Sequence, residues 1–218
     1  MRRSLIPLAL AGALGFLTFG AVSGKTRAED GRITVRPDVN PWNVIGRLNV
    51  SGYRARRHCT ATLVEPRIAL TAWHCLLQFF RDGVVDPRAV HFLPGYDRGS
   101  FHEHLRGVTY QRRGDDVVLI TLDHTSSLVP VAMERVTPTT GDALFQAGYS
   151  SDRSQVLTAD PACKYLGPAA QGRWLHDCEA VAGDSGAPIL WDTGHGLVVV
   201  AIHVGRTADG TGIAEPLN

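Results

Sequence analysis

Residues 183–188 read GDSGAP and lead directly into the apolar run ILW at residues 189–191. The run places the hydroxyl of Ser185 between two glycines and beside the carboxylate of Asp184. Glycine permits a tight turn and leaves backbone N–H groups uncovered, which suits a nucleophile whose attack creates an oxyanion. Because a serine hydroxyl alone is a weak nucleophile at neutral pH, the stretch predicts that a base lies elsewhere in the chain.

Two other segments supply a base and an acid. Residues 71–75, TAWHC, end an apolar strand with His74, and residues 114–120, GDDVVLI, place Asp116 at the entry of a strongly apolar strand. Histidine can take and return a proton near neutral pH, and a carboxylate can orient it. Taken singly, each segment has a structural explanation as a buried histidine, a turn or a solvated carboxylate. Together, in the order His, Asp, Ser, they predict a catalytic triad.

These three segments resemble those of the trypsin/chymotrypsin-like serine peptidases, and the resemblance covers about residues 41–218. It implies that Ser185 attacks a peptide carbonyl, that His74 acts as general base and acid, and that Asp116 orients the imidazole. The backbone N–H groups of Gly183 and Ser185 are implied as the oxyanion hole. The implied protein is an all-β serine endopeptidase with two packed antiparallel six-stranded β-barrels, little helix, and no cofactor or metal ion.

The resemblance also places the substrate pocket at Glu179, Ala180, His203 and Gly205. Glu179 lies six residues before Ser185, where trypsin-like members carry an acid that selects Arg or Lys. His203 lies on the strand expected to form the pocket wall and is similar to the histidine of glutamyl endopeptidases, which receives an acidic side chain. The two cues oppose each other. We predict cleavage after basic residues, with glutamyl specificity as the alternative.

The spacing of short β-like segments supports two β halves independently of the resemblance. Each is rich in Val, Ile, Leu, Thr or Tyr and is bounded by turn residues. Only residues 72–80 favour a helical turn or two, and residues 125–140 form the natural connector, dividing the chain into barrel one at about 41–127 and barrel two at about 128–218. The predicted strands are residues 43–50, 60–64, 67–71, 90–93, 108–110, 117–122, 143–149, 155–159, 187–191, 197–204 and 212–214.

The N-terminus has the layout of a secretory signal peptide. Arg2 and Arg3 precede an apolar run that extends to about residue 22, and the small residues Ser23 and Gly24 follow. We assign the signal peptide to residues 1–23, with a retained anchor helix as the alternative, since the run is nearly long enough to span a bilayer. We expect a secreted or periplasmic protein without stable membrane association after cleavage.

Residues 24–40 are polar and irregular, and we predict a propeptide or linker there, followed by the peptidase domain at 41–218. Animal members of the resembled family begin with Ile-Val-Gly-Gly, whose freed amine pairs with the acid before the nucleophile. Residues 42–46 read WNVIG instead, which is similar to the bacterial-type exported branch. We hypothesise a zymogen activated by cleavage within residues 24–40; the sequence does not identify the partner of Asp184.

Four cysteines in an exported chain predict disulfides before metal ligands. Three pairings are open, and proximity in the sequence favours Cys59 with Cys75 and Cys163 with Cys178. One metal hypothesis concerns His102, Glu103 and His104, but it lacks an evident third ligand, and a surface loop is the better explanation.

The composition fits a globular monomer, with 44% hydrophobic and 20% charged residues and a formal net charge of +1. The charge excludes a dedicated polyanion-binding protein, and the basic cluster at residues 54–57 predicts a solvated hairpin rather than a nucleic-acid site. The expected partners are protein or peptide substrates and a proteinaceous inhibitor. The rival function is a catalytically silent homologue that binds a partner through the same cleft; an esterase on the same triad is a further alternative.

Overall fold

The computed structural model describes residues 30–51, 56–78 and 83–217. Outside these ranges lie the predicted signal peptide at residues 1–23 with its anchor alternative, and residues 54–55 of the basic cluster at 54–57. Within them, no helix combines the length and the apolar character needed to cross a membrane.

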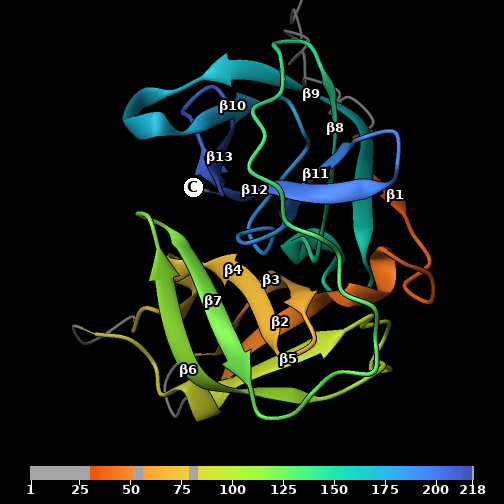
Figure 1. Ribbon diagram of the computed structural model, residues 1–218, viewed down its shortest axis with the longest axis vertical. Coiled ribbons are helices and arrows are strands. Elements are labelled where there is room, and N and C mark those ends of the chain that lie inside the picture. Colours follow the sequence, from red (N-terminus) through yellow and green to blue (C-terminus); the bar gives the residue numbers. More distant parts are fainter. Residues whose placement is uncertain (1–29, 52–55, 79–82, 218) are drawn as a thin grey trace, which may run out of the picture.

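Two antiparallel β-barrels make up the fold, one above the other in Figure 1. Barrel one closes in the order β2-β3-β4-β7-β6-β5. Its strands are β2 (Ile45–Ser51), β3 (Arg56–Glu65), β4 (Ile68–Ala72), β5 (Val90–Pro94), β6 (Leu105–Arg113) and β7 (Val117–Leu122). Closure leaves no free sheet edge, so that every strand pairs on both sides.

Barrel two has six strands in the order β9-β10-β13-β12-β11-β8, closed by pairing of β8 with β9. These are β8 (Ala143–Gly148), β9 (Thr158–Pro168), β10 (Trp174–His176), β11 (Pro188–Asp192), β12 (Leu197–Arg206) and β13 (Gly212–Pro216). A short strand, β1 (Ile33–Thr34), pairs with β9 on the outside. The predicted fold of two six-stranded barrels is therefore confirmed.

The helical content of the described chain consists of short 3-10 helices. They are η1 (Trp42–Val44), η2 (Trp73–Leu76), η3 (Pro87–Ala89), η4 (Ser151–Arg153) and η5 (Ala170–Gly172). Of these, η2 lies within the one stretch, residues 72–80, where the sequence favours a helical turn. It carries His74 at the end of β4.

Alternating burial along the strands explains why each barrel closes on an apolar interior. In β2, Gly46, Leu48 and Val50 are buried while Arg47 and Asn49 between them are partly exposed, the period of two expected of a strand with one face in a core. One continuous apolar cluster includes residues of both barrels, such as Leu70 of β4 and Val199 of β12. The two barrels are therefore packed together through a shared core.

The connector between the barrels, residues 123–142, contacts both of them. Val131 N–H donates to the Leu63 carbonyl of β3 at 3.2 Å, and Met133 forms an isolated parallel bridge with Val199 of β12.

Both disulfides favoured by sequence proximity are present. Cys59–Cys75 joins β3 to η2, and Cys163–Cys178 joins β9 to the segment after β10. The first lies directly beside His74, and the second lies directly before Glu179.

Described residues before the predicted domain start at residue 41 already contact the fold. Residues 30–36 lie against barrel two, with Ile33 opposite Ala159 and Val35 N–H donating to the Leu157 carbonyl at 3.1 Å. No strand is predictable here from the sequence, because β1 has only two residues, both exposed. The strand β10 was also not predicted, since it has only three residues.

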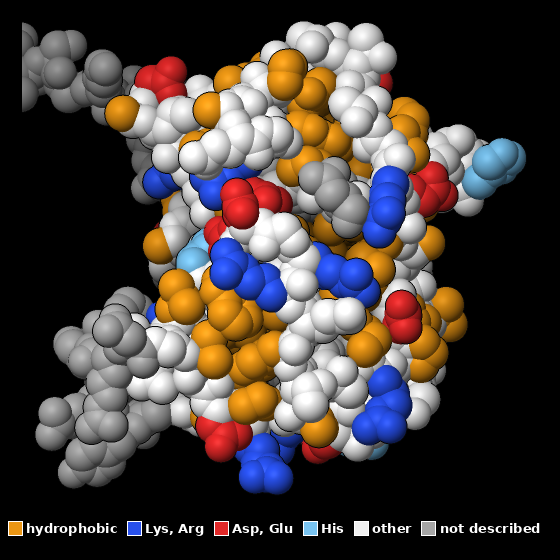
Figure 2. Space-filling view, turned by 60° about the vertical axis from the view of Figure 1, so that its left-hand side comes forward, with side chains coloured by type: hydrophobic (Ala, Val, Ile, Leu, Met, Phe, Trp, Pro, Cys, Tyr) orange, Lys and Arg blue, Asp and Glu red, His pale blue; other side chains and the backbone are white. Residues whose placement is uncertain are grey.

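The surface mixes charges of both signs. On the face shown in Figure 2, arginines, acidic residues and hydrophobic side chains alternate, and the basic groups do not merge into one continuous patch.

Candidate active site

Pairing of β4 with β7 brings His74 and Asp116 together. Ala72 is opposite Val117, so the residues that follow β4 and precede β7 are neighbours. The backbone N–H of His74 donates to Asp116 Oδ1 at 2.9 Å, and its Nδ1 lies 2.7 Å from Oδ2. The Asp116 side chain is 16% exposed and the His74 side chain is 38% exposed. The carboxylate thus fixes the imidazole, whose other nitrogen remains available.

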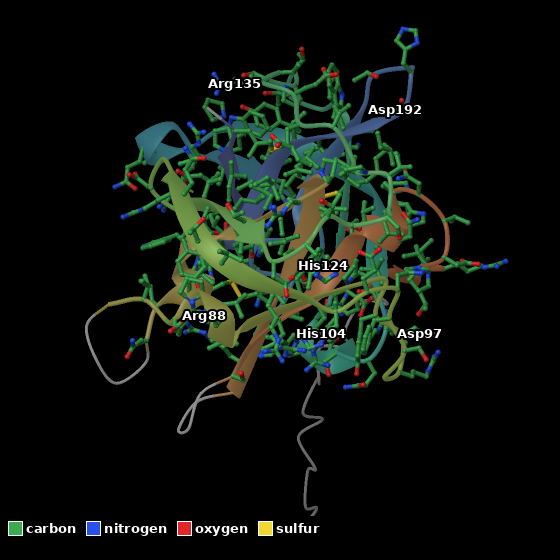
Figure 3. The ribbon with its side chains drawn as sticks, turned by 60° about the horizontal axis from the view of Figure 1, so that its bottom comes forward. Arg88, Asp97, His104, His124, Arg135 and Asp192 are labelled. Carbon is green, nitrogen blue, oxygen red and sulfur yellow. A yellow bond between two sulfur atoms is a disulfide. The ribbon has the colours of Figure 1, made fainter. Side chains whose placement is uncertain are left out.

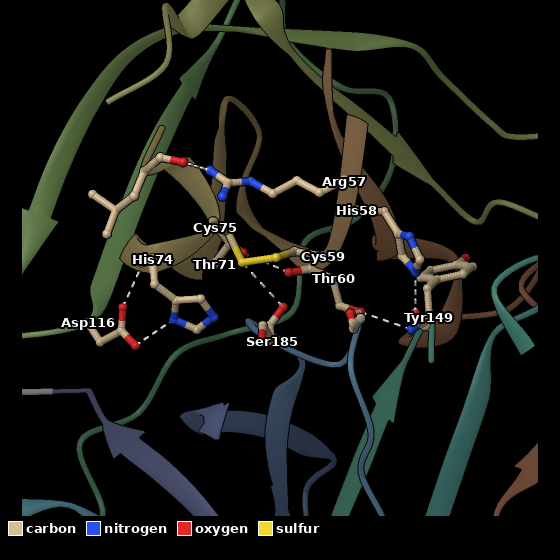
Figure 4. The surroundings of a disulfide bond; sticks show 12 residues. Arg57, His58, Cys59, Thr60, Thr71, His74, Cys75, Asp116, Tyr149 and Ser185 are labelled. Carbon is tan, nitrogen blue, oxygen red and sulfur yellow. Dashed lines mark hydrogen bonds and ion pairs between the residues drawn. A yellow bond between two sulfur atoms is a disulfide. The ribbon is translucent and has the colours of Figure 1, made fainter. Parts of the chain in front are cut away.

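Ser185 comes from barrel two and meets this pair at the junction of the barrels. Its carbonyl accepts the Thr60 N–H of β3 at 2.9 Å. In Figure 4 the imidazole of His74 extends from Asp116 toward Ser185, beside the Cys59–Cys75 disulfide. Among the hydrogen bonds of the described chain, none joins the Ser185 hydroxyl to His74; such bonds are often long without substrate.

Gly183 has the backbone conformation that only glycine adopts easily. Its φ is +98°, and a Cβ would lie 2.4 Å from the Tyr149 carbonyl oxygen and 2.8 Å from His58 Nε2. The turn leaves two donors open: in the described chain, the backbone N–H groups of Gly183 and Ser185 make no hydrogen bond, whereas that of Asp184 donates to the Val181 carbonyl. Two uncommitted N–H groups beside a serine hydroxyl can stabilise an oxyanion.

The carboxylate of Asp184 is buried beneath this turn and is 1% exposed as a residue. Both its oxygens accept the Ser150 hydroxyl at 2.8 Å, and Oδ2 also accepts the Val181 N–H at 2.8 Å. Burial raises the pKa of Asp184 to about 6, although both hydrogen bonds and the charge of Arg32 favour the ionised form. The partners of Asp184 are therefore side-chain and backbone groups of barrel two.

The four expected pocket residues differ in their surroundings. Glu179 is exposed, and its backbone N–H donates to Asp160 Oδ2 at 2.9 Å. Ala180 is 1% exposed. At Gly205 an added Cβ would meet no atom within 4 Å, so the strand is open at that point. The opposite chemistry of Glu179 and His203 would allow the two side chains to pair and neutralise the pocket, but no hydrogen bond or ion pair joins them in the described chain.

His203 is buried on β12 directly beside the turn of residues 183–186, called here the nucleophile turn because it holds Ser185, the expected nucleophile. Its backbone carbonyl accepts the Gly186 N–H and its N–H donates to the Ala187 carbonyl, both at 2.8 Å. Its ring Nδ1 lies 3.1 Å from Nε2 of His176, a buried residue of β10. The sequence did not indicate His176, because only the pairing of β10 with β13 and of β13 with β12 brings it near.

The tautomers of these two histidines follow from one backbone bond. The Cys178 N–H donates to His176 Nδ1 at 3.2 Å, so that nitrogen is an acceptor. His176 therefore carries its proton on Nε2 and donates to His203 Nδ1, which leaves the proton of a neutral His203 on its Nε2. Burial lowers the pKa of His176 to about 4, and burial and nearby cationic groups lower that of His203 well below the usual value. Both rings are thus neutral at pH 7.

The metal hypothesis at residues 102–104 finds no support in the described chain, where no cluster of three ligand-type side chains occurs. His102 Nε2 lies 2.7 Å from the Pro37 carbonyl oxygen, and Glu103 accepts the Ser127 N–H. His104, labelled on the outer surface of barrel one in Figure 3, contacts His91. These contacts fit the surface loop expected as the better explanation.

Comparison with known proteins gives a family match. The chain matches the family model described as a trypsin-like peptidase domain over residues 59–202, more than half of its length. A search of curated proteins finds no match. The matched residues include parts of both barrels and the segments that hold His74, Asp116 and Ser185.

Solved structures share the fold. A Glu endopeptidase in complex with MPD aligns with a TM-score of 0.71 at 18% identity, covering 88% of this chain and 93% of that one. The thermostable serine protease AL20 from an extremophilic microorganism aligns with a TM-score of 0.68 at 19% identity, covering 80% and 91%. The protease Anisep from Arthrobacter nicotinovorans gives 0.68 at 12% identity, covering 85% and 93%. With the family match and the two barrels, the resemblance expected from the sequence is confirmed: the chain belongs to the trypsin-like peptidase family of serine endopeptidases.

Proposed function

We propose that the protein hydrolyses peptide bonds through a triad of Ser185, His74 and Asp116. The observation that carries the proposal is the pair of hydrogen bonds from His74 to the two oxygens of Asp116. With the proton on Nδ1 held by the carboxylate, Nε2 of His74 has a free lone pair and acts as the base.

In the proposed reaction Ser185 Oγ attacks the scissile carbonyl carbon while its proton passes to His74 Nε2. The carbonyl oxygen becomes an oxyanion, which the N–H groups of Gly183 and Ser185 stabilise. The C–N bond then breaks, His74 returns the proton to the leaving amine, and an acyl-enzyme remains. Water activated by the same histidine releases the acid product.

For specificity, the chemistry of the site supports cleavage after acidic residues better than the basic preference predicted first. Glu179 is exposed, and among the described residues its one hydrogen bond is from its backbone N–H to Asp160, so none directs its carboxylate toward Ser185. His203, by contrast, is buried beside the nucleophile turn, and the bond from His176 leaves its Nε2–H as a donor. A neutral donor next to the turn can hydrogen-bond a substrate carboxylate. We therefore assign the acidic preference to His203, with His176 holding its tautomer.

The catalytic proposal is tested with a fluorophosphonate probe on the oxidised, processed protein. We expect covalent labelling of the wild type and none of Ser185→Ala. A wild-type protein that folds but neither labels nor hydrolyses peptides would instead be the catalytically silent binding homologue. A labelled protein that hydrolyses ester substrates but not peptides would instead be an esterase.

The specificity proposal is tested with peptides that differ only in the residue before the scissile bond. We expect kcat/KM for Glu to exceed that for Arg, and the ratio to collapse in His203→Gln, with Glu179→Gln as the matched control that preserves it. Cleavage after Arg or Lys that is lost in Glu179→Gln would establish the basic preference instead.

Export is proposed from the signal layout at residues 1–23 and the two disulfides, which persist in oxidising compartments. Mass spectrometry of the protein from the culture medium or periplasm gives the mature N-terminus. A protein that is recovered from the cytoplasm and still begins with Met1 would contradict the proposal.

A further inference from the structure

The segment of residues 30–36, called here the N-terminal arm, is held on barrel two mainly by polar contacts. Its strand β1 pairs with β9 along the outer side of the barrel, but Ile33 in that strand is 52% exposed. The apolar contribution of the arm comes mainly from Val35, which is partly buried against the hydrophobic core. The arm also buries Arg32, whose side chain is only 3% exposed.

Arg32 lies at the centre of an ion cluster between the arm and η4. Its guanidinium donates to both oxygens of Asp152, at 3.2 and 2.7 Å, and to Asp30 at 3.0 Å. Arg153 donates to the Arg32 carbonyl at 3.1 Å and to both oxygens of Asp30 at 3.1 and 3.0 Å. Two arginines and two aspartates balance in charge, as buried charges require. Burial alone would lower the pKa of Arg32, but its bonds to Asp152 and Asp30 outweigh burial and raise it.

The same short segment contacts the nucleophile turn on its other side. Ser150, which precedes η4, donates its hydroxyl to Asp184, and Ser151 N–H donates to the Ala182 carbonyl at 2.6 Å. The Tyr149 carbonyl is the atom nearest to the position of a Cβ at Gly183. Residues 149–153 thus lie between the arm and the turn that holds the two open N–H groups.

Charge links the two ends of this path. The positive charge of Arg32 lowers the pKa of buried Asp184, and the negative charge of Asp152 raises it. Two further titratable groups of the described chain lie beside the turn: His58 is next to Gly183, and buried His203 is hydrogen-bonded through its backbone to Gly186 and Ala187. The ionised carboxylate is the better acceptor for the Ser150 hydroxyl and the Val181 N–H, so a buried cation favours the bonded form.

We propose that Arg32 is a positioning residue: through Asp152 and Ser150, the N-terminal arm holds Asp184 and the turn 181–185 in the shape that presents the oxyanion-hole donors. This inference rests on the proposed peptidase function. In this protein an internal arginine on the arm performs the ordering of the turn. The arm from Asp30 onward must therefore remain in the active enzyme, and any activating cleavage within residues 24–40 falls before Asp30.

The test measures kcat, KM and the pH dependence of kcat/KM for Arg32→Ala, Arg32→Lys and the control Arg36→Ala. Arg36 lies on the same arm but is 82% exposed and pairs only with Asp38 in the described chain. We expect Arg32→Ala to lower kcat roughly 10- to 100-fold, with a smaller change in KM. This loss in kcat is smaller than the loss expected from removing an oxyanion-hole donor outright. The acid limb of kcat/KM should move to higher pH, because Asp184 loses a nearby cation. Arg32→Lys should recover part of both, and Arg36→Ala should match the wild type.

Coupling through the proposed path is tested by the double variant Arg32→Ala/Ser150→Ala. The effects on kcat should be less than additive, since both substitutions release the same carboxylate. If Arg32→Ala does not fold, Asp152→Asn combined with Ser150→Ala gives the same cycle with a near-isosteric change. Wild-type kcat in folded Arg32→Ala, or full additivity, overturns the inference while leaving the peptidase function intact. An inactive, unlabelled wild type overturns the peptidase function itself.

Discussion

Asp116 and its neighbour Asp115 provide a matched pair at the scale of single residues. Asp116 binds His74 through both oxygens, whereas the Asp115 side chain is exposed. Asp116→Asn should lower kcat by roughly 10⁴-fold, because the amide favours the wrong tautomer of the histidine. Asp115→Asn should remain within a factor of about two. Steady-state kinetics on one peptide substrate give both values, and equal losses would contradict the assigned role.

Gly186 offers a second residue-scale prediction. Its φ is +80°, and a Cβ would lie 2.2 Å from Thr71 Oγ1 and 2.4 Å from the Thr60 carbonyl oxygen. Gly194 has a similar φ of +83° with no atom within 4 Å of the Cβ position, so it isolates the backbone cost. Gly194→Ala should cost about 1 kcal/mol of unfolding free energy, and Gly186→Ala well over 3 kcal/mol.

Urea unfolding measures this difference, with both substitutions made in Ser185→Ala protein to prevent self-digestion. Equal destabilisation by the two substitutions would mean that the contact with β3 and β4 does not constrain the turn.

The sequence indicated the triad residues because each lies in a short run whose residue types suit the chemistry. His176 could not be predicted, because its role depends on strand pairing between β10, β13 and β12. Arg32 could not be predicted either, because a lone arginine in a polar segment carries no periodic signal. Glu179 was predicted to line the pocket only from its separation of six residues from Ser185 along the sequence. Sequence separation does not determine where a side chain points.

The disulfides allow a prediction at the scale of elements. Cys59–Cys75 and Cys163–Cys178 close loops of nearly equal length, with sequence separations of 16 and 15. Replacing either pair by alanines should therefore cost a similar unfolding free energy, about 3 kcal/mol on the chain-entropy model. The kinetic effects should differ, because Cys75 follows His74 directly and Cys178 precedes the expected pocket.

We expect removal of Cys59–Cys75 to lower kcat, and removal of Cys163–Cys178 to act more strongly on KM. Kinetics well below the melting temperature of each variant separate the two effects. Identical changes in kcat and KM would show that both bonds act on stability alone.

Most strands of the two barrels could be predicted, since runs such as 117–122 are apolar, β-branched and bounded by turns. Their ends were less accurate: β9 begins at Thr158 rather than residue 155 and continues to Pro168. That extension is held by pairing with β8 and β10, which local sequence does not encode.

At the scale of the whole molecule, two buried groups of barrel two act oppositely on stability as pH changes. His176 has a pKa of about 4, below its usual 6.5, so its contribution is complete above pH 6.5 and is lost as pH falls to about 4. Asp184 has a pKa of about 6, above 3.8, so its contribution is present below about pH 3.8 and is lost as pH rises toward 6. Each amounts to roughly 3 kcal/mol, and they largely offset between pH 4 and 6.

Asp184→Asn should remove one of these opposing contributions, since the amide keeps the shape and partners of the carboxylate without titrating. The variant should lose stability more steeply than its parent between pH 6.5 and 4. Urea midpoints at several pH values, in Ser185→Ala protein, make the comparison, and parallel curves would contradict the assignment.

The N-terminal arm has a consequence for how the molecule is assembled. Ile33 is synthesised before every other described strand, yet its partner Ala159 lies 126 positions later (159 minus 33). Closing so long a loop is slow compared with local pairing, so the arm docks only after barrel two has formed. If the docked arm shapes the oxyanion hole, catalysis begins with the last step of folding. Partly folded chains contain unfolded segments that are the easiest substrates for proteolysis. Other chains at the same stage of folding are then still inactive and cannot cleave them.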